Sequence, residues 1–273
     1  MNVQNQDVAA EETILLSSLD DGVLRLTLNR PKARNALSEA MLAALQESLD
    51  AAKANDDVRA IVICGNGPAF SAGHDLKEVS ARRQDEDRGR KYFEWLMATC
   101  SNVMQTVVYS PKPVIAEVAG IASAAGCQLA ASCDLVVASS QAQFCTPGVN
   151  IGLFCSTPMV AISRAMSRKH MMEMLLTGDM MDAETAFRFG LVNKVAAPED
   201  LRSETNALAQ KIASKSSAVV AIGKEAFYRQ RDMPLADAYQ YCSDVMVENM
   251  MFRDAEEGIG AFMEKRSPKW EDR

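Results

Sequence analysis

Short apolar runs alternate with segments of helical periodicity over about the first 198 residues, and this alternation limits the fold more than any other feature. Apolar runs at 14–18 and 23–28 flank an Asp-Asp-Gly turn, which predicts a β-hairpin. Ser38 precedes apolar residues at helical spacing and predicts a capped helix, and the run at 58–64 predicts a buried strand. The order strand, strand, helix, strand predicts an α/β core.

Beyond residue 198 the chain shows helical periodicity only. Four helices are expected, at 199–214, 218–231, 235–251 and 255–266. Amphipathic helices without a sheet cannot easily bury their own apolar faces. We therefore expect a core over residues 1–198 and a helical region over residues 199–273 that is used for oligomer contacts.

Composition excludes several classes of protein. Hydrophobic residues make up 48% of the 273 residues, yet no apolar run is long enough for a membrane span. A net charge of −7 disfavours binding to nucleic acid or to an anionic membrane surface. Residues 1–12 are acidic and contain no basic residue, so they resemble neither a signal peptide nor a transit peptide. These features predict a cytoplasmic protein.

The cysteines and histidines give no pattern for a metal site. Seven cysteines occur without a Cys-x-x-Cys pair and mostly in apolar surroundings, which is typical of buried reduced thiols. The two histidines, His74 and His170, fall outside metal-ligand spacing with the cysteines. No metal or disulfide is expected.

Residues 119–129 combine a strand end and a helix start on small residues, AGIASAAGCQL. A helix start leaves N–H groups without partners and carries the positive end of the helix dipole. Such a site suits a carbonyl oxygen that becomes negative during a reaction. The same stretch offers Gln128 where an acid or base would need a carboxylate.

Other local signals complete the pattern. Residues 65–73 are predicted to be a glycine-punctuated loop, and the charged segment 82–90 is predicted to be exposed and mobile. Thr157 before a proline predicts a helix cap, and Gly178 predicts a helix end. Residues 191–195 are predicted to form a strand.

Five motifs occur in the order found in the crotonase, or enoyl-CoA hydratase/isomerase, superfamily, which the sequence resembles along almost its whole length. They are NRPKARNAL at 29–37, FSAGHDL at 70–76, GCQLA followed by Cys133-Asp134, LTG at 176–178 and FMEKR at 262–266. More narrowly, His74, the run at 124–128 and TPGVNIGLFCSTP at 146–158 resemble the enoyl-CoA hydratase domain-containing protein 3 branch.

The resemblance implies a ClpP-like spiral of strand-strand-helix units, a helical trimerisation region, and homotrimers or hexamers. It implies an acyl-CoA thioester ligand, with coenzyme A as part of the substrate and no other cofactor. The thioester oxygen would lie between the backbone amides of His74 and Ala125, and Lys265 would reach a neighbouring subunit's ligand. The other expected ligand contacts are Lys32, Arg34, Ala36, Ala72, Asp75, Leu76 and Lys77.

The sequence departs from the family pattern at two catalytic positions. Hydratases of the family use two glutamates, where this chain has Gln128 and Gly148. Each missing acid or base removes about 10²- to 10⁴-fold in rate, so we expect inefficient hydration. The alternatives are a noncatalytic acyl-CoA binder and a decarboxylase-like enzyme that uses His74.

The sequence allows two possible roles for each of three side chains. The His74 ring either acts on the acyl group or hydrogen-bonds a carbonyl so that only its amide matters. Asp75 is either catalytic or, more in keeping with its loop position, an acceptor for local backbone N–H groups. Cys155 is either a small apolar filler of the acyl pocket or a nucleophile.

Overall fold

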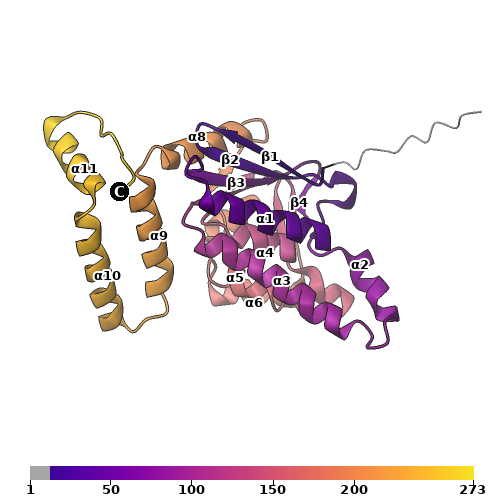
Figure 1. The fold of residues 1–273 in the computed structure, drawn as a ribbon. Helices are drawn as coiled ribbons and strands as arrows, with labels where there is room; N and C mark the ends of the chain where they lie inside the picture. Colours follow the sequence, from indigo (N-terminus) through magenta and orange to yellow (C-terminus); the bar gives the residue numbers. More distant parts are fainter. Residues whose placement is uncertain (1–12) are drawn as a thin grey trace, which may run out of the picture.

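The structure is a computed structural model that describes residues 13–273. The prediction that residues 1–12 carry no targeting signal lies outside the described residues. In the described part the chain forms a mixed α/β core followed by four helices, as the sequence pattern predicts (Figure 1).

The larger sheet has six strands in the order β1-β2-β3-β5-β7-β10. They are β1 (Leu15–Asp20), β2 (Val23–Leu28), β3 (Ala60–Gly65), β5 (Val114–Val118), β7 (Leu135–Ser139) and β10 (Lys194–Ala196). β1 and β2 pair antiparallel, which confirms the hairpin, and the other pairs are parallel. β3 is apolar throughout and β5 is apolar except for Glu117, which pairs with Arg25, as expected for strands covered on both faces.

A second sheet was not apparent in the sequence. It consists of β4 (Ala69–Ser71), β6 (Ile121–Ser123), β8 (Gln143–Cys145) and β9 (Met181–Asp182). The prediction of a plain loop over 65–73 is therefore wrong, and so is a direct passage from strand to helix at 119–129. Strands of two or three residues are too short to show a period of two.

Two local predictions also need correction. The strand expected at 191–195 begins only at Lys194, as β10. Leu191 and Val192 are buried in the preceding turn and not in the strand. The helix α5 (Pro158–Ile162) begins at its proline as expected, but the Thr157 side chain makes no capping hydrogen bond. Its backbone already has helical dihedral angles, whereas a capping side chain works best from an extended residue.

The remaining core helices cover the sheets and include one that is almost wholly buried. They are α1 (Glu39–Ala54), α2 (Leu76–Ala81), α3 (Arg90–Tyr109), α4 (Ala125–Ser132), α6 (Arg168–Thr177) and α7 (Ala183–Arg188). Ser38 caps α1 and Gly178 ends α6 in the left-handed region, as predicted. Seven of the eight residues of α4 are buried. Segment 82–90 is exposed apart from Gly89.

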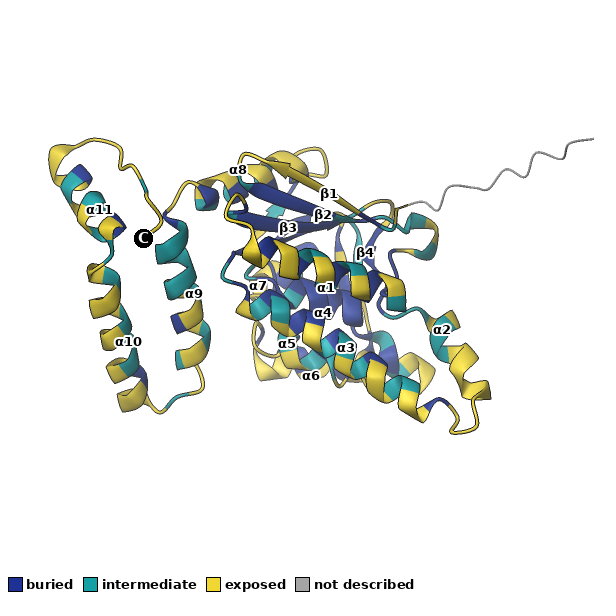
Figure 2. Cartoon of the chain, viewed as in Figure 1, coloured by how far each residue is buried: buried dark blue, intermediate teal, exposed yellow. Residues whose placement is uncertain are grey.

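The helical region contains α8 (Leu201–Ala213), α9 (Ser217–Gln230), α10 (Leu235–Met250) and α11 (Arg253–Glu264). α8 packs Leu201, Ala209 and Ala213 against the large sheet. The helices α10 and α11 stand away from the core (Figure 1), and Figure 2 colours much of them as exposed. Their exposed residues include many large apolar ones. None of the helices in residues 13–273 combines the length and apolar character needed to cross a membrane.

A buried ion pair attaches α9 to the core. The Lys224 ammonium donates to Asp134 Oδ2 at 2.7 Å and to the carbonyls of Val107 and Lys112 at 3.2 and 3.1 Å. Tyr228 donates its hydroxyl to Asp134 Oδ1 at 2.8 Å. Because both charges are fully hydrogen-bonded, this pair fixes the direction in which the helical region leaves the core.

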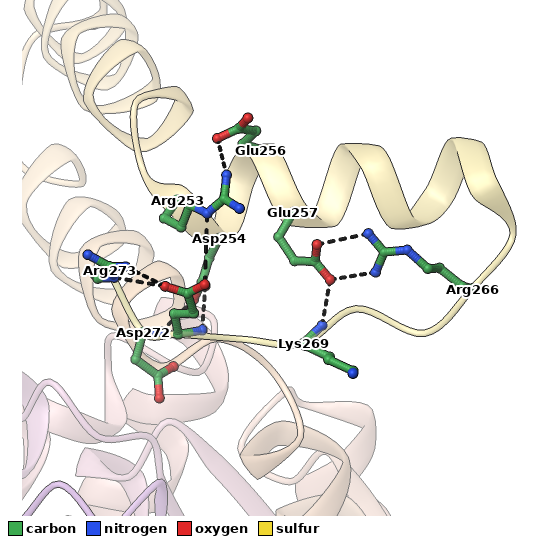
Figure 3. A network of polar contacts seen from close by, with 9 residues as sticks. Arg253, Asp254, Glu256, Glu257, Arg266, Lys269, Asp272 and Arg273 are labelled. Carbon is green, nitrogen blue, oxygen red and sulfur yellow. Dashed lines mark hydrogen bonds and ion pairs between the residues drawn. The ribbon is translucent and has the colours of Figure 1, made fainter.

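The carboxyl-terminal tail attaches α11 to the rest of the chain (Figure 3). Asp254, 1% exposed, accepts the backbone N–H groups of Glu271 and Asp272 at 2.7 and 2.9 Å. Arg59 pairs with the Asp272 carboxylate at 2.7 Å. The last residues therefore connect α11 to the core.

We predict that Gly126→Ala destabilises the protein by about 2 kcal/mol, because a Cβ there would lie 2.2 Å from the Ser71 carbonyl oxygen. Gly223→Ala is the matched control, since α9 leaves open space at that position. Alanine there should be neutral or stabilise the helix by up to about 1 kcal/mol. The midpoints of denaturant unfolding measure the stability of both variants. Equal midpoints for Gly126→Ala and Gly223→Ala would contradict the close packing of α4 on β4.

Candidate active site

The segments 29–37 and 70–76 lie side by side although they are far apart in the sequence. The Leu37 N–H donates to the Gly73 carbonyl at 2.8 Å, and the Ala72 N–H donates to the Arg34 carbonyl at 2.9 Å. Arg30 pairs with Asp75 at 3.1 Å. These contacts bring the expected phosphate-binding residues next to the loop that carries His74.

Asn35 holds this arrangement from inside. It is fully buried with φ of 53°, and its Nδ2 donates to the carbonyls of Asn66 and Ala69 at 2.9 and 2.8 Å. Its Oδ1 accepts the Arg30 N–H at 2.8 Å. Sequence reasoning missed Asn35 and Arg30 as positioning residues, although both stand in the motif at 29–37.

The loop that carries His74 also lies against the start of α4. A Cβ added at Gly73 would lie 3.1 Å from the Ala124 Cβ and 3.3 Å from the Ala125 nitrogen. Within residues 13–273 the backbone N–H groups of His74 and Ala125 donate no hydrogen bond. Two free N–H donors, one from each segment, are therefore available at this contact.

The unusual backbone angle falls one residue before the expected donor. Ala125 has an ordinary helical φ, whereas Ala124 has φ of 48° and ψ of −116°. The Ala124 N–H donates to the Cys145 carbonyl at 2.9 Å, so β8 holds this conformation. A strained non-glycine residue persists only where its surroundings fix it, and such positions cluster at functional sites.

His74 is half-buried as a residue, and its ring is neutral at physiological pH. Both of its nitrogens are shielded from solvent and have no hydrogen-bond partner of good geometry among the described residues. Burial lowers the pKa of His74, and a weaker interaction with the Leu37 backbone raises it. The neutral imidazole can therefore donate or accept one hydrogen bond from a ligand.

Gln128 lies on α4, one turn after Ala125. It is 4% exposed, and its Oε1 has no hydrogen-bond partner among residues 13–273. Of the expected catalytic residues, Gln128 is the one that lines a cavity of about 660 Å³. As a neutral amide it can orient a ligand or water but cannot take a proton at physiological pH.

Gly148 lies in the 3-10 helix η3 (Pro147–Ile151) with no room for a side chain. A Cβ there would lie 2.9 Å from Cys155 Sγ and 3.0 Å from the Leu153 carbonyl oxygen. A carboxylate would therefore require Cys155 to move. Burial raises the pKa of the Cys155 thiol, so it stays protonated and is a poor nucleophile.

The expected ligand contacts divide into two groups. Lys32, Arg34 and Lys77 are exposed and form no ion pair within the described chain. Asp75 caps α2 by accepting the Lys77 N–H at 3.1 Å, in keeping with the loop-stabilising interpretation. Ala36 is buried, Ala72 is half-buried and Leu76 is exposed.

Lys265 is not brought to the other contacts within one chain. It follows α11, which lies on the opposite side of the molecule from α2 (Figure 1). Among residues 13–273, no cluster of His, Cys, Asp or Glu is suited to a metal ion.

Comparison with known proteins gives the family. The family model described as enoyl-CoA hydratase/isomerase matches residues 18–273. The chain belongs to the enoyl-CoA hydratase/isomerase family. Membership implies an acyl-CoA ligand, and the family recognised from the five motifs is confirmed.

Individual relatives agree with this assignment. Human mitochondrial enoyl-CoA hydratase domain-containing protein 3 is 49% identical over 250 residues, covering 92% of this chain and 81% of the relative. The crystal structure of the human protein has a TM-score of 0.90 at 46% identity and covers 94% of this chain and 100% of that one. An enoyl-CoA hydratase structure from Mycobacterium smegmatis has a TM-score of 0.90 at 50% identity and covers 95% and 99% of the two chains. The crotonase fold is confirmed.

We predict that His74 makes stability fall as the pH is lowered below the ordinary histidine pKa of 6.5. Below that pH the unfolded chain takes up a proton on His74, whereas the folded chain resists protonation until a lower pH. The free energy of unfolding of His74→Gln should therefore fall less steeply than that of the wild type between about pH 6.5 and 5. Urea unfolding at a series of pH values gives the change in the free energy of unfolding with pH for each protein. The two curves should have the same slope above pH 7. The same slope at every pH would show that folding does not lower the pKa of His74.

Proposed function

We propose that this protein binds acyl-CoA thioesters and stabilises a thioester enolate with the backbone N–H groups of His74 and Ala125. The observation that supports the proposal is the contact between Gly73 and the start of α4, which brings these two free donors together. The helix dipole of α4 adds positive potential at the same point. Losing one such donor typically costs about 3 kcal/mol of transition-state stabilisation.

Local cations would bind the nucleotide. The chain carries a net charge of −7, so the anionic phosphates of coenzyme A need a basic patch. Lys32, Arg34 and Lys77 supply one on the adjoining segments, and Lys265 would serve the ligand of a neighbouring subunit.

Hydration by two carboxylates is not supported. Gln128 and Gly148 stand where the family resemblance leads us to expect the two glutamates, and Cys155 occupies the space beside Gly148. Without a general base, water addition loses about 10²-fold or more. We therefore propose a reaction that needs the oxyanion donors and no glutamate pair.

Decarboxylation is the second candidate, and the buried unpaired His74 ring favours it. The bond to a carboxylate on the α-carbon breaks, CO₂ leaves, and the electron pair forms the thioester enolate, which then takes a proton. Unchanged activity in His74→Ala would count against a role for the ring. A noncatalytic acyl-CoA binder remains the alternative, and any turnover in a mass-spectrometric substrate panel would exclude it.

We also propose that the chain forms a homotrimer or a dimer of trimers through the helical region. Exposed apolar residues on α10 and α11 support this, namely Tyr239, Met246, Val247, Ile259, Phe262 and Met263. A single-chain mass in light scattering would rule it out.

We propose a cytoplasmic location, although the human relative is described as mitochondrial. Cell fractionation distinguishes the two locations.

We predict that acetoacetyl-CoA binds more tightly than acetyl-CoA, because its acidic α-carbon lets it bind as an enolate against the two N–H donors. Calorimetry should show saturable binding of both thioesters, and difference spectroscopy should show the enolate only in the complex. Free coenzyme A is the control for nucleotide binding alone. No saturable binding of any thioester would refute the proposal.

Restoring one carboxylate should restore part of the hydration chemistry. We predict that Gln128→Glu raises crotonyl-CoA hydration by about 10²-fold, followed as loss of enoyl absorbance. Gln105→Glu, which adds a carboxylate to the same cavity from α3, is the matched control and should leave the rate unchanged. An equal gain in both variants would show that charge alone explains the effect.

A further inference from the structure

The cavity of about 660 Å³ lies along α4 and begins at Gln128, one turn after the proposed donor Ala125. Ala125, Gln128 and Ala131 are spaced three residues apart, so they share one face of the helix. Gln128 and Ala131 line the cavity, together with residues of α3, α5 and α9. An acyl chain whose carbonyl lies on the Ala125 N–H would therefore pass Gln128 and enter the cavity, whose volume lies within the usual range for ligand pockets.

The cavity is lined by both apolar and cationic side chains. Its wall includes the apolar side chains of Met104, Val108 and Ala161, which are buried or half-buried. At the exposed end lie Arg164 and Arg231. The exposed part of the wall therefore combines two cations with the apolar side chains of Tyr109, Val160 and Phe227.

The two arginines are held in place without a carboxylate partner. Arg231 Nη2 donates to the Arg164 carbonyl at 3.1 Å, and Arg164 Nη1 donates to the Val160 carbonyl at 2.7 Å. Neither guanidinium forms an ion pair within the described residues. Each guanidinium has five N–H donors, so most of them remain free for an anion.

Two carboxylates, Asp134 and Asp232, also line the cavity. Asp134 is neutralised by Lys224 at 2.7 Å. Asp232 pairs with neither arginine, which leaves two cations against one uncompensated carboxylate. The exposed end is therefore net positive.

We propose that this cavity takes the acyl group and that Arg164 and Arg231 bind a carboxylate at its far end. The preferred ligands would then be ω-carboxyacyl-CoA thioesters, an inference that rests on the proposed acyl-CoA function. From Ala125 to Ala131 the helix rises about 9 Å. An acyl chain of about eight carbons spans that distance at about 1.2 Å per bond.

The test compares suberoyl-CoA with octanoyl-CoA, which differ only in the terminal carboxylate, by calorimetry on the full chain. Suberoyl-CoA should bind the wild type about tenfold more tightly or better. In the double variant Arg164→Gln/Arg231→Gln the two affinities should become equal, with octanoyl-CoA unchanged. Arg229→Gln, an exposed arginine of α9 paired with Glu225, is the matched control and should keep the preference.

Each other outcome overturns the inference in a different way. Equal affinities in the wild type, or a preference that survives the double variant, would remove the role of the arginines. Weaker binding of free coenzyme A to the double variant would show that the arginines hold the phosphates instead. Loss of the preference in Arg229→Gln would show that net charge alone explains it. If neither thioester binds, the proposed function fails together with this inference.

Discussion

The first turn of α4 packs against β4 so closely that position 126 has no room for a Cβ, and the candidate site depends on this contact. The helix is buried on nearly all sides, so its initial N–H groups cannot all be solvated from the surface. Gly73 approaches the same turn from the other segment. The contact leaves two N–H donors unpaired within a largely buried site, where a developing oxyanion gains more than it would in water.

Charge is placed at the rim of the site and is absent from its centre. Gln128 is a neutral amide, His74 is kept neutral by burial, and Cys155 keeps its proton. Under the proposed function, stabilisation of an enolate would therefore come from preorganised backbone dipoles and not from ionised side chains. Lys32 and Arg34 lie outside this centre in solvent, where an ammonium or guanidinium costs no desolvation.

Local patterns predicted elements well where each element is long enough to show its period. Ser38 caps α1, Gly178 ends α6, and the four helices after residue 200 form as expected. The second sheet was missed because its strands have three residues or fewer. Asn35 was missed as a positioning residue because its partners, Asn66 and Ala69, are distant in sequence.

The sequence by itself determined the family, through five ordered motifs, and that Gln128 and Gly148 offer no carboxylate, because residue type fixes whether a side chain can take up a proton. Only the tertiary structure decided that the His74 ring is buried without a partner, that Cys155 fills the space beside Gly148, and that α10 and α11 expose apolar faces. Burial and hydrogen-bond partners arise from contacts between segments far apart along the chain, and the period of a single segment does not contain them.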